Sequence, residues 1–290
     1  MSIAVVGIGY WGKNLIREFS KISTVSHCIT TGTKSNIDWL KKNFPKINHS
    51  TDFESVLKNP NVTSIIIATP IDTHFDLALK SLKFGKHVFV EKTLSENSSN
   101  ALKLLKIAKQ KKVCLFTGHI FYYHPIFKKI IDLHKDEKIE FMKFDWLKHE
   151  NSNENIFLDL VSHDLFLILV LFGKPKLIKL LNSFKILDKI DVVLIQAKYS
   201  KQNCILHINR FYYEKSKVVS FKTKKGFYVW KDYCLFKLNK KTKQYRLYFK
   251  SDKSSLSLEC REFMKIITKK PDYKNAQLSV NVLRLIETIK

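Results

Sequence analysis

The sequence predicts an α/β protein in which a doubly wound parallel sheet comes first and an α+β domain follows. Two observations predict the parallel sheet: short apolar runs alternate with helical segments, and a glycine-rich turn follows the first run. One observation predicts the α+β domain, because beyond residue 119 strand patterns follow one another with short polar turns between them. We therefore expect two domains, at residues 1–119 and 120–290.

The first domain alternates strands and helices along its whole length. Residues 2–6 are apolar and β-branched without polar alternation, which is typical of a strand buried on both faces. Such alternation implies parallel strands joined by right-handed crossovers. Further strands are predicted at 25–30, 64–68, 87–90 and 113–117, and helices at 13–21, 35–43, 53–57, 72–84 and 95–111.

The second domain begins with two predicted helices and continues as a large, mainly antiparallel, open-faced sheet. The helices are predicted at 127–133 and 156–172, and two more close the chain at 256–267 and 277–289. The strands are predicted at 141–147, 176–187, 192–199, 204–212, 218–223, 227–231 and 244–249.

The composition excludes several classes of protein. The formal net charge is +25, but the lysines are spread along the chain and accompany no nucleic-acid motif. We therefore expect a solvated basic surface and no nucleic-acid partner. The alternative is a positive field that helps to collect an anionic cofactor and substrate. The longest apolar stretch, residues 165–172, is far shorter than the about 20 residues that cross a bilayer, so no membrane association is expected.

The cysteines and histidines indicate neither disulfides nor a metal site. Five cysteines are widely separated and form no C-x-x-C pair, which favours reduced thiols in a cytoplasmic protein. The N-terminal apolar run lacks the basic start of a signal peptide. No metal is predicted, because four histidines lack ligand spacing with cysteines or carboxylates: His119, His124, His149 and His207.

A G-x-G-x-x-G motif joins the first strand to the first helix. The first glycine permits the tight turn, the second lets the backbone approach a pyrophosphate, and the third lets helix and strand pack closely. The free amides of the helix N-terminus favour a negatively charged group there. The context predicts a dinucleotide-binding Rossmann domain whose cofactor contacts include Gly7, Gly9, Tyr10, Trp11 and Gly12.

The end of the second strand differs from a usual NAD site. NAD sites often place a carboxylate there for the ribose hydroxyls, whereas residues 29–35 contain none. Hydroxyl groups and a lysine suit a 2′-phosphate, so Thr31 and Lys34 are candidate contacts and NADP is slightly favoured over NAD. The alternative is that these residues form only a turn and a helix cap.

Several motifs, in order and spacing, resemble the Gfo/Idh/MocA family of oxidoreductases, related to glucose–fructose oxidoreductase and inositol dehydrogenase. The opening Gly9-Tyr10-Trp11-Gly12-Lys13-Asn14 is similar to the sugar-nucleotide 3-dehydrogenase branch of the family. The other motifs are Ala68-Thr69-Pro70 with His74, Gly85-Lys86-His87-Val88-Phe89-Val90-Glu91-Lys92, Gly118-His119 with Tyr123-His124-Pro125, and Leu158-Asp159-Leu160-Val161-Ser162-His163-Asp164.

The resemblance implies a site and a reaction. It implies Lys92 and His163 as the catalytic pair, with Asp159 assisting and Tyr123 contacting the substrate. It adds Ala68, Thr69, Pro70, His74, Glu91 and Lys92 to the cofactor contacts. It also implies an open-faced sheet that mediates a homo-oligomer, either a dimer or a tetramer.

The chemistry of these side chains agrees with such roles. Lys92 ends a parallel strand, where ligands bind in doubly wound sheets, and it can stabilise charge on a reacting oxygen. Asp159 and His163 are four residues apart, so both project from one helix face, and a histidine can take or return a proton near neutral pH. Taken alone, the pair could equally be a core histidine and a helix-stabilising carboxylate.

Three departures from the family pattern accompany the resemblance. Thr93 follows the lysine where proline is usual, and Val161-Ser162 replaces the usual glycine before the histidine. The second domain is also shorter than usual.

We expect hydride transfer between NAD(P) and a secondary alcohol or ketone of a sugar, and more specifically of a nucleotide sugar in surface-polysaccharide synthesis. One alternative is an NADP-dependent reductase of a keto sugar, imine or other carbonyl. The other is a catalytically silent NAD(P)-sensing regulator, which Thr93 and the short second domain motivate.

Overall fold

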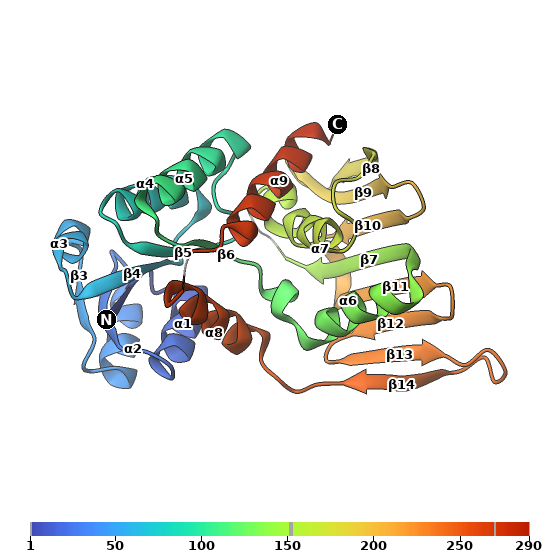
Figure 1. Cartoon of the computed structure of the whole chain (residues 1–290), viewed down its shortest axis with the longest axis horizontal. Helices are drawn as coiled ribbons and strands as arrows, with labels where there is room; N and C mark the ends of the chain where they lie inside the picture. Colours follow the sequence, from blue (N-terminus) through green and yellow to red (C-terminus); the bar gives the residue numbers. More distant parts are fainter. Residues whose placement is uncertain (1, 151–152, 270, 290) are drawn as a thin grey trace. The chain divides into compact units, whose positions relative to one another are not determined.

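The structure is a computed structural model that describes residues 2–150, 153–269 and 271–289. The chain forms two compact units (Figure 1). The first unit contains Met1–His119 and Leu256–Asn281, and the second contains Ile120–Ser255 and Val282–Lys290. Whether the cut that we placed after residue 119 separates independently folding domains stays a prediction.

The first unit contains a six-stranded parallel sheet in the order β3-β2-β1-β4-β5-β6. This is the order of a dinucleotide-binding doubly wound sheet, and it confirms the predicted fold class. The direction of the strand order reverses between β1 and β4, where such sheets open a crevice at the carboxyl ends of the strands. The strands are β1 (Ser2–Val6), β2 (Val25–Ile29), β3 (Asn48–Ser50), β4 (Val62–Ile67), β5 (His87–Glu91) and β6 (Leu115–Gly118).

Helices cover both faces of this sheet (Figure 1). Helix α1 buries the apolar face formed by Leu15, Ile16 and Phe19. Helix α3 begins where predicted, because the Asp52 carboxylate accepts a hydrogen bond from the Ser55 N–H at 3.0 Å. The helices are α1 (Tyr10–Ser20), α2 (Lys34–Asn43), α3 (Phe53–Lys58), α4 (Ile71–Lys83) and α5 (Ser98–Lys111).

Helix α8 (Ser255–Ile267) also packs on the first unit, although it follows the second sheet in the sequence. Its Phe263 is fully buried, and the centroid of its ring lies 6.0, 5.6 and 5.7 Å from those of Phe19, Phe89 and Phe116. Edge-to-face aromatic contacts of this kind add to the stability from buried apolar area. The aromatic cluster therefore joins α8 to α1 and to strands β5 and β6.

The second unit contains an eight-stranded sheet in the order β14-β13-β12-β11-β7-β10-β9-β8. Its neighbours pair antiparallel except for β7 and β10, which are parallel, and this confirms a mainly antiparallel sheet. The strands are β7 (Ile139–His149), β8 (Leu177–Lys185), β9 (Ile190–Lys198), β10 (Asn203–Asn209), β11 (Phe211–Thr223), β12 (Phe227–Lys231), β13 (Cys234–Leu238) and β14 (Tyr245–Lys250).

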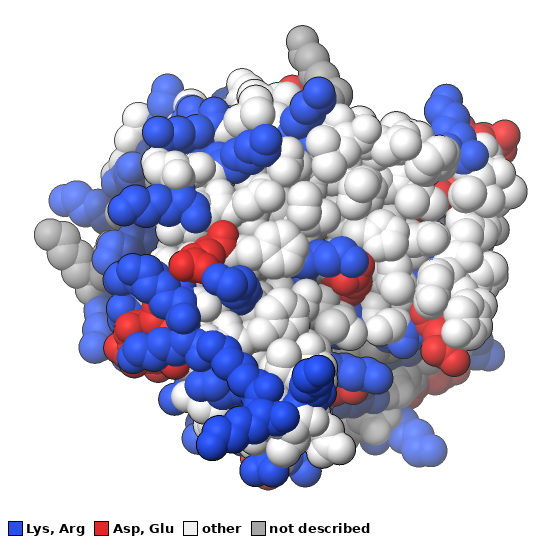
Figure 2. All heavy atoms as spheres, turned by 90° about the vertical axis from the view of Figure 1, so that its right-hand side faces the viewer, with Lys and Arg blue, Asp and Glu red and all other residues white. Residues whose placement is uncertain are grey.

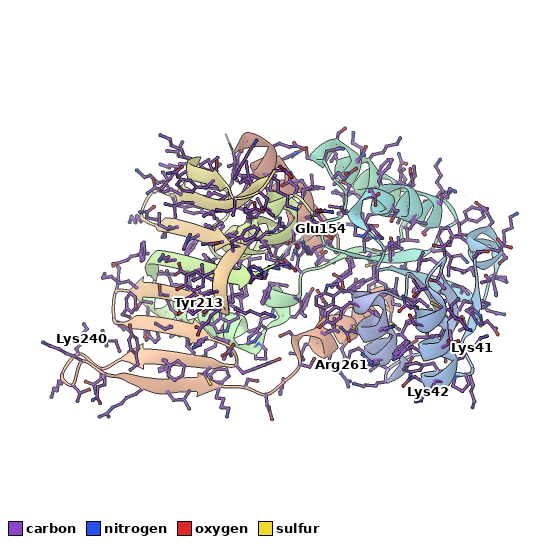
Figure 3. The ribbon with its side chains drawn as sticks, turned by 180° about the vertical axis from the view of Figure 1, so that it is seen from behind. Lys41, Lys42, Glu154, Tyr213, Lys240 and Arg261 are labelled. Atoms are coloured by element: carbon purple, nitrogen blue, oxygen red, sulfur yellow. The ribbon has the colours of Figure 1, made fainter. Side chains whose placement is uncertain are left out.

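Helices α6 (Pro125–Glu137) and α7 (Ser162–Phe172) lie over one face of this sheet (Figure 1). A 3-10 turn, η1 (Ile120–Tyr123), precedes α6, and a π-helical turn, η2 (Phe157–Val161), leads into α7. Helix α9 (Lys274–Thr288) contributes to both units. The opposite sheet face carries exposed side chains such as Tyr213 on β11 (Figure 3).

Two strands were not predicted from the sequence. Strand β3 consists of three exposed polar residues, so it has no apolar pattern. Strand β13 follows β12 closely, and its five residues were hidden in a segment rich in lysine. Among the described helices, none combines the length and apolar character needed to traverse a bilayer.

Candidate functional site

The turn after β1 is built so that only glycine fits at two positions. Gly7 has a φ of +92°, and a Cβ there would lie 2.8 Å from the Ala68 carbonyl oxygen. A Cβ at Gly12 would lie 2.1 Å from the Gly7 carbonyl oxygen. The first and third glycines therefore permit the turn and the close packing of α1 on β1, as their spacing predicts.

Gly9 serves a different purpose, because a Cβ there would meet nothing within 4 Å. It is the N-cap of α1, and no side chain caps that end of the helix. No acidic residue lies in the first turn of α1. Open space above uncapped helix amides suits a phosphate group, so the residues present fit a dinucleotide.

Tyr10 and Trp11 extend from this turn. Their side chains are 76% and 40% exposed, and their rings contact each other edge-to-face with centroids 5.5 Å apart. Exposed aromatic side chains beside the open space at Gly9 and the first amides of α1, called the glycine cradle below, leave contact area for a ligand. Their predicted cofactor contact stays a prediction.

The segment after β2 keeps the properties that favoured a 2′-phosphate. The Thr30 hydroxyl accepts the Gly32 N–H at 2.8 Å and fixes the turn. Thr31 and Lys34 are exposed, and Thr33 caps α2 without a side-chain hydrogen bond. The start of α2 therefore presents hydroxyl groups, free amides and an ammonium, without a carboxylate in its first turn.

His74 links the loop after β4 to the loop after β5. It is 1% exposed, and its Nδ1 and Nε2 atoms lie 2.7 and 2.8 Å from the carbonyl oxygens of Thr93 and Thr69. Burial lowers the pKa of His74 and Lys92 lowers it further, whereas the two carbonyl contacts raise it. The predicted cofactor segment Ala68, Thr69 and Pro70 is thereby tied to the residues that follow Lys92.

Lys92 follows directly after β5, at the same sheet edge as the glycine turn. Its neighbour Glu91 is partly buried, and burial raises the pKa of Glu91 to about 7 despite the opposing effect of the Lys92 charge. The Lys92–Thr93 peptide bond is cis. The Thr93 hydroxyl donates a hydrogen bond to the Ser95 carbonyl at 3.1 Å.

In the second unit, His163 lies in the first turn of α7 and is 8% exposed. The centroid of its ring is 5.1 Å from that of Phe121 and 5.2 Å from that of Trp146. Phe121 belongs to η1 and Trp146 to β7, so three elements fix the position of the imidazole.

Asp159 lies in the π-helical turn before α7, where its carboxylate meets a buried arginine. Arg210 is 0% exposed, and its Nη2 donates to the Asp159 Oδ2 atom at 2.7 Å. Its Nη1 donates to the Glu154 carbonyl at 2.7 Å, in the segment labelled in Figure 3. A guanidinium held through its two terminal nitrogens fixes the position of the Asp159 carboxylate.

Asp164 anchors α7, as expected for a side chain directed away from a substrate. It is fully buried, and its Oδ1 atom lies 3.4 Å from the Lys217 ammonium. The ammonium also lies 3.4 Å from the ring centroids of both Phe121 and Trp146. Burial raises the pKa of Asp164, and Lys217 opposes this effect. The Lys217 ammonium, enclosed by the Asp164 carboxylate and two aromatic rings, therefore lies beside the two rings that contact His163.

Tyr123, the predicted substrate contact, is 7% exposed. Its ring contacts that of Tyr122 with centroids 4.9 Å apart, and the Lys128 ammonium lies 3.4 Å from the Tyr122 ring centroid. Its side chain therefore takes part in the packing at the start of α6.

The structure gathers the predicted residues into two groups, one in each unit. In the first unit, the residues predicted to bind the cofactor lie beyond the carboxyl ends of β1, β2, β4 and β5, with His74 in α4. In the second unit, Asp159 and His163 lie in adjoining helical turns. Sequence reasoning missed Arg210 and Lys217, which hold the carboxylates on either side of His163. Over the described residues, no cluster of three or more His, Cys, Asp and Glu side chains is arranged to hold a metal ion.

Comparison with known proteins agrees with this geometry. Residues 1–119 match the GFO_IDH_MocA model, described as an oxidoreductase family with an NAD-binding Rossmann fold. This region is similar to the Gfo/Idh/MocA family. The family resemblance of the sequence motifs is therefore confirmed.

Relatives of the Gfo/Idh/MocA region include enzymes with different substrates. UDP-N-acetylglucosamine 3-dehydrogenase of Acidithiobacillus ferrooxidans is 23% identical over 66% of this chain and 61% of its own length. The scyllo-inositol 2-dehydrogenase (NADP(+)) IolW of Bacillus subtilis is 24% identical over 60% of this chain and 53% of its own length. The chain spans less than two thirds of these relatives and of the other first curated matches.

A solved structure of the same A. ferrooxidans dehydrogenase, GnnA, has a TM-score of 0.89 with this chain at 18% identity. The match covers 99% of this chain and 95% of that structure. At this identity the likeness establishes the fold over both units.

Proposed function

We propose that the protein is a nicotinamide-dependent oxidoreductase that transfers a hydride to or from a secondary alcohol or ketone of a sugar. The observation that carries this proposal is the open space at Gly9, beyond the same carboxyl ends of the strands where Lys92 follows β5. The family of residues 1–119 supports a nicotinamide cofactor.

The cofactor would lie on the first unit. Gly7, Gly9 and the first amides of α1 would hold the pyrophosphate, with Tyr10, Trp11 and Gly12 beside it. We propose NADP over NAD by a small margin, because Thr31 and Lys34 are exposed at the start of α2 and no carboxylate lies among residues 29–35.

The reaction would use Lys92 and His163. A bound nicotinamide supplies a carbon that accepts or returns a hydride. During oxidation, His163 takes the hydroxyl proton while the carbon-bound hydrogen leaves with its electron pair, and the C–O bond becomes a carbonyl. The Lys92 ammonium stabilises the negative charge on that oxygen, and Asp159, fixed by Arg210, orients the substrate hydroxyl. Tyr123 would line the substrate side.

A nucleotide sugar is the substrate class that we favour, with oxidation at the sugar 3-position in surface-polysaccharide synthesis. The Tyr10-Trp11 opening and the UDP-N-acetylglucosamine 3-dehydrogenase relative support it. The net charge of +25 favours a substrate that carries a diphosphate. The IolW relative supports an uncharged polyol as the competing substrate.

Cofactor binding tests the first part of the proposal. Titration with NADPH and with NADH, followed by nicotinamide fluorescence, should give tighter binding of NADPH. K34E should weaken NADPH binding about tenfold by placing a carboxylate near the 2′-phosphate, with little effect on NADH. Lys41→Glu, an exposed change in the same helix (Figure 3), is the matched control. Absence of binding for both dinucleotides would refute the proposal.

Turnover tests the second part. K92A and H163A should each lower kcat by at least about 100-fold while the dinucleotide Kd changes little, since neither side chain is part of the glycine cradle. Retention of full turnover by both variants would remove the proposed chemistry and leave a regulator that only senses the dinucleotide.

We also propose a homo-oligomer formed through the sheet of the second unit. The sheet face away from α6 and α7 carries apolar side chains, including Leu177 and Phe184, which are 50% and 53% exposed. Figure 2 presents one face of the molecule, on which basic side chains crowd one border and leave a broad area without charge. Light scattering should give a dimer or tetramer, and L177K/F184K should dissociate it.

A reducing, cytoplasmic location fits this reaction. All five cysteines are free, and burial raises the pKa of Cys28, Cys114 and Cys204 to about 12, so these thiols stay protonated and unreactive.

A further inference from the structure

Two carboxyl groups lie near Lys92, a partly buried one of Glu91 and a buried one of Glu259, from parts of the chain far apart in sequence. Glu91 ends β5 and pairs with Gly118 of β6, and its Oε2 atom lies 3.0 Å from the position of a Cβ on Gly118. Glu259 projects from α8 and accepts the backbone N–H of His119, the next residue. Both carboxyl groups therefore lie against the Gly118–His119 segment, entirely within the first unit.

Glu259 is in an unusual position for an ionised side chain. It is 1% exposed, and among the described residues its Oε1 atom has no hydrogen-bond partner. Burial raises the pKa of Glu259 well above its usual value, and the charge of Glu91 raises it further. In the ionised form, the Glu259 Oε1 atom can only accept a hydrogen bond, and the part of the chain that the structure describes offers no donor for it. In the protonated form, it could donate a hydrogen bond to a neighbouring carboxylate.

The surrounding charges do not compensate two carboxylates. Lys92 supplies one positive charge next to Glu91. His119 does not add another, because burial and Lys92 lower its pKa to about 3. Other ionisable groups nearby are His74, whose pKa burial lowers, and Cys260, whose thiol interacts with Glu259, Glu91 and Glu18. Two buried carboxyl groups that face one cation bind a proton between them.

We propose that Glu259 carries a proton that it shares with Glu91, so that Glu91 alone bears the negative charge that positions the Lys92 ammonium. Glu259 is then a positioning residue that acts on the reaction through Glu91 and Lys92. This inference rests on the proposed role of Lys92 for its kinetic part, but the shared proton belongs to the folded protein with or without turnover.

The protonation state is tested first, on the protein without substrate. With glutamate labelled by 13C at the side-chain carboxyl, pH titration by NMR should reveal one carboxyl that stays protonated at neutral pH. That signal should vanish in E259Q and persist in E262Q, a half-exposed glutamate of the same helix that pairs with Lys265. Because Glu91 itself titrates near pH 7, the deciding signal is the one that stays protonated above that pH. Its absence from the wild-type protein, or its survival in E259Q, would overturn the proposal. The wild-type spectrum decides the question even if a variant does not fold.

Kinetics then test the effect on Lys92. Because Glu91 must be ionised to position the ammonium, kcat should fall as the pH drops through about 7. E259L removes the donor and should move this fall to higher pH and lower kcat about tenfold at pH 7, with the dinucleotide Kd unchanged. E259Q can still donate a hydrogen bond and should restore most of the lost turnover. Equal pH profiles for E259L and the wild-type protein would refute the positioning role. If no dinucleotide supports turnover, the proposed function fails, and the NMR result still stands or falls by itself.

Discussion

At the scale of single residues, the site depends on charged groups whose partners come from distant strands. Asp159 and Asp164 flank His163, and each is held by a cation of the second unit, Arg210 or Lys217. These ion pairs fix the helical turns that carry the imidazole. Removal of one partner leaves the other as an uncompensated buried charge, which costs more than the pair contributes.

Arg210→Met should therefore lower the free energy of unfolding by about 3 kcal/mol, because it leaves the Asp159 carboxylate without its cationic partner. The double variant R210M/D159N should regain part of that loss, since no charge is then left unpaired. Urea denaturation measures both values. Arg246→Met, at an exposed site of β14, is the control and should change stability by less than about 0.5 kcal/mol. Additive effects of R210M and D159N would contradict the direct coupling.

The same residues explain which part of the site could be predicted. Sequence motifs predicted catalytic roles for Lys92 and His163, because each lies in a local pattern that the sequence displays directly. Arg210 and Lys217 were not predicted, because their partners are 51 and 53 positions away in the sequence. Which side chains come into contact at that separation depends on how the strands pair. One signal for Arg210 was available: it is among five arginines in a chain with 51 Lys and Arg residues. Arg210 binds the Glu154 carbonyl and the Asp159 carboxylate through separate nitrogens of one planar group, a geometry that lysine cannot supply.

At the scale of elements, the turn between β1 and α1 separates two roles of glycine. Gly12 is needed for packing, because a Cβ would overlap the Gly7 carbonyl oxygen at 2.1 Å. Gly9 is surrounded by open space, so the fold itself does not require it. The five apolar strands of the parallel sheet were predicted for the same reason as this turn, because local apolar runs and glycines mark them in the sequence. The short polar β3 was not, because its pairing with β2 depends on the assembled sheet.

G9A and G12A should therefore have opposite consequences. G12A should destabilise the protein by at least about 1–3 kcal/mol, through overlap of backbone and side chain. G9A should keep the melting temperature within a few degrees but weaken dinucleotide binding at least about tenfold, because its methyl group fills the space left for the pyrophosphate. Calorimetry and fluorescence titration measure the two effects. Unchanged binding in G9A would place the dinucleotide elsewhere.

At the scale of the whole molecule, buried ionisable groups make stability depend on pH in both directions. Burial lowers the pKa of His119 to about 3 and of His124 to about 4, below the usual value near 6.5. Below about pH 6.5 these histidines therefore bind protons in the unfolded chain but not in the folded one. Their contribution to the free energy of unfolding is lost as the pH falls from that value. Glu91 opposes this trend: its raised pKa gives a contribution that is present at low pH and is lost as the pH rises through about 7.

H119Q should flatten the acid branch of the stability curve. Each refused proton contributes a slope of about 1.4 kcal/mol per pH unit, so the variant should lose up to that much of the slope between pH 6 and pH 4. Urea denaturation at successive pH values measures the slope. Identical slopes for H119Q and the wild-type protein would mean that His119 is protonated in the folded state.

The contribution of α8 to the first unit constrains how the chain matures during synthesis. The ribosome translates Phe89 and Phe116 long before Phe263, whose ring covers theirs in the folded protein. While the ribosome makes the intervening sheet, the nascent first unit must keep this apolar surface exposed, a state that chaperones recognise. A stalled or truncated chain that ends before α8 should therefore aggregate, although it contains every residue of the glycine cradle.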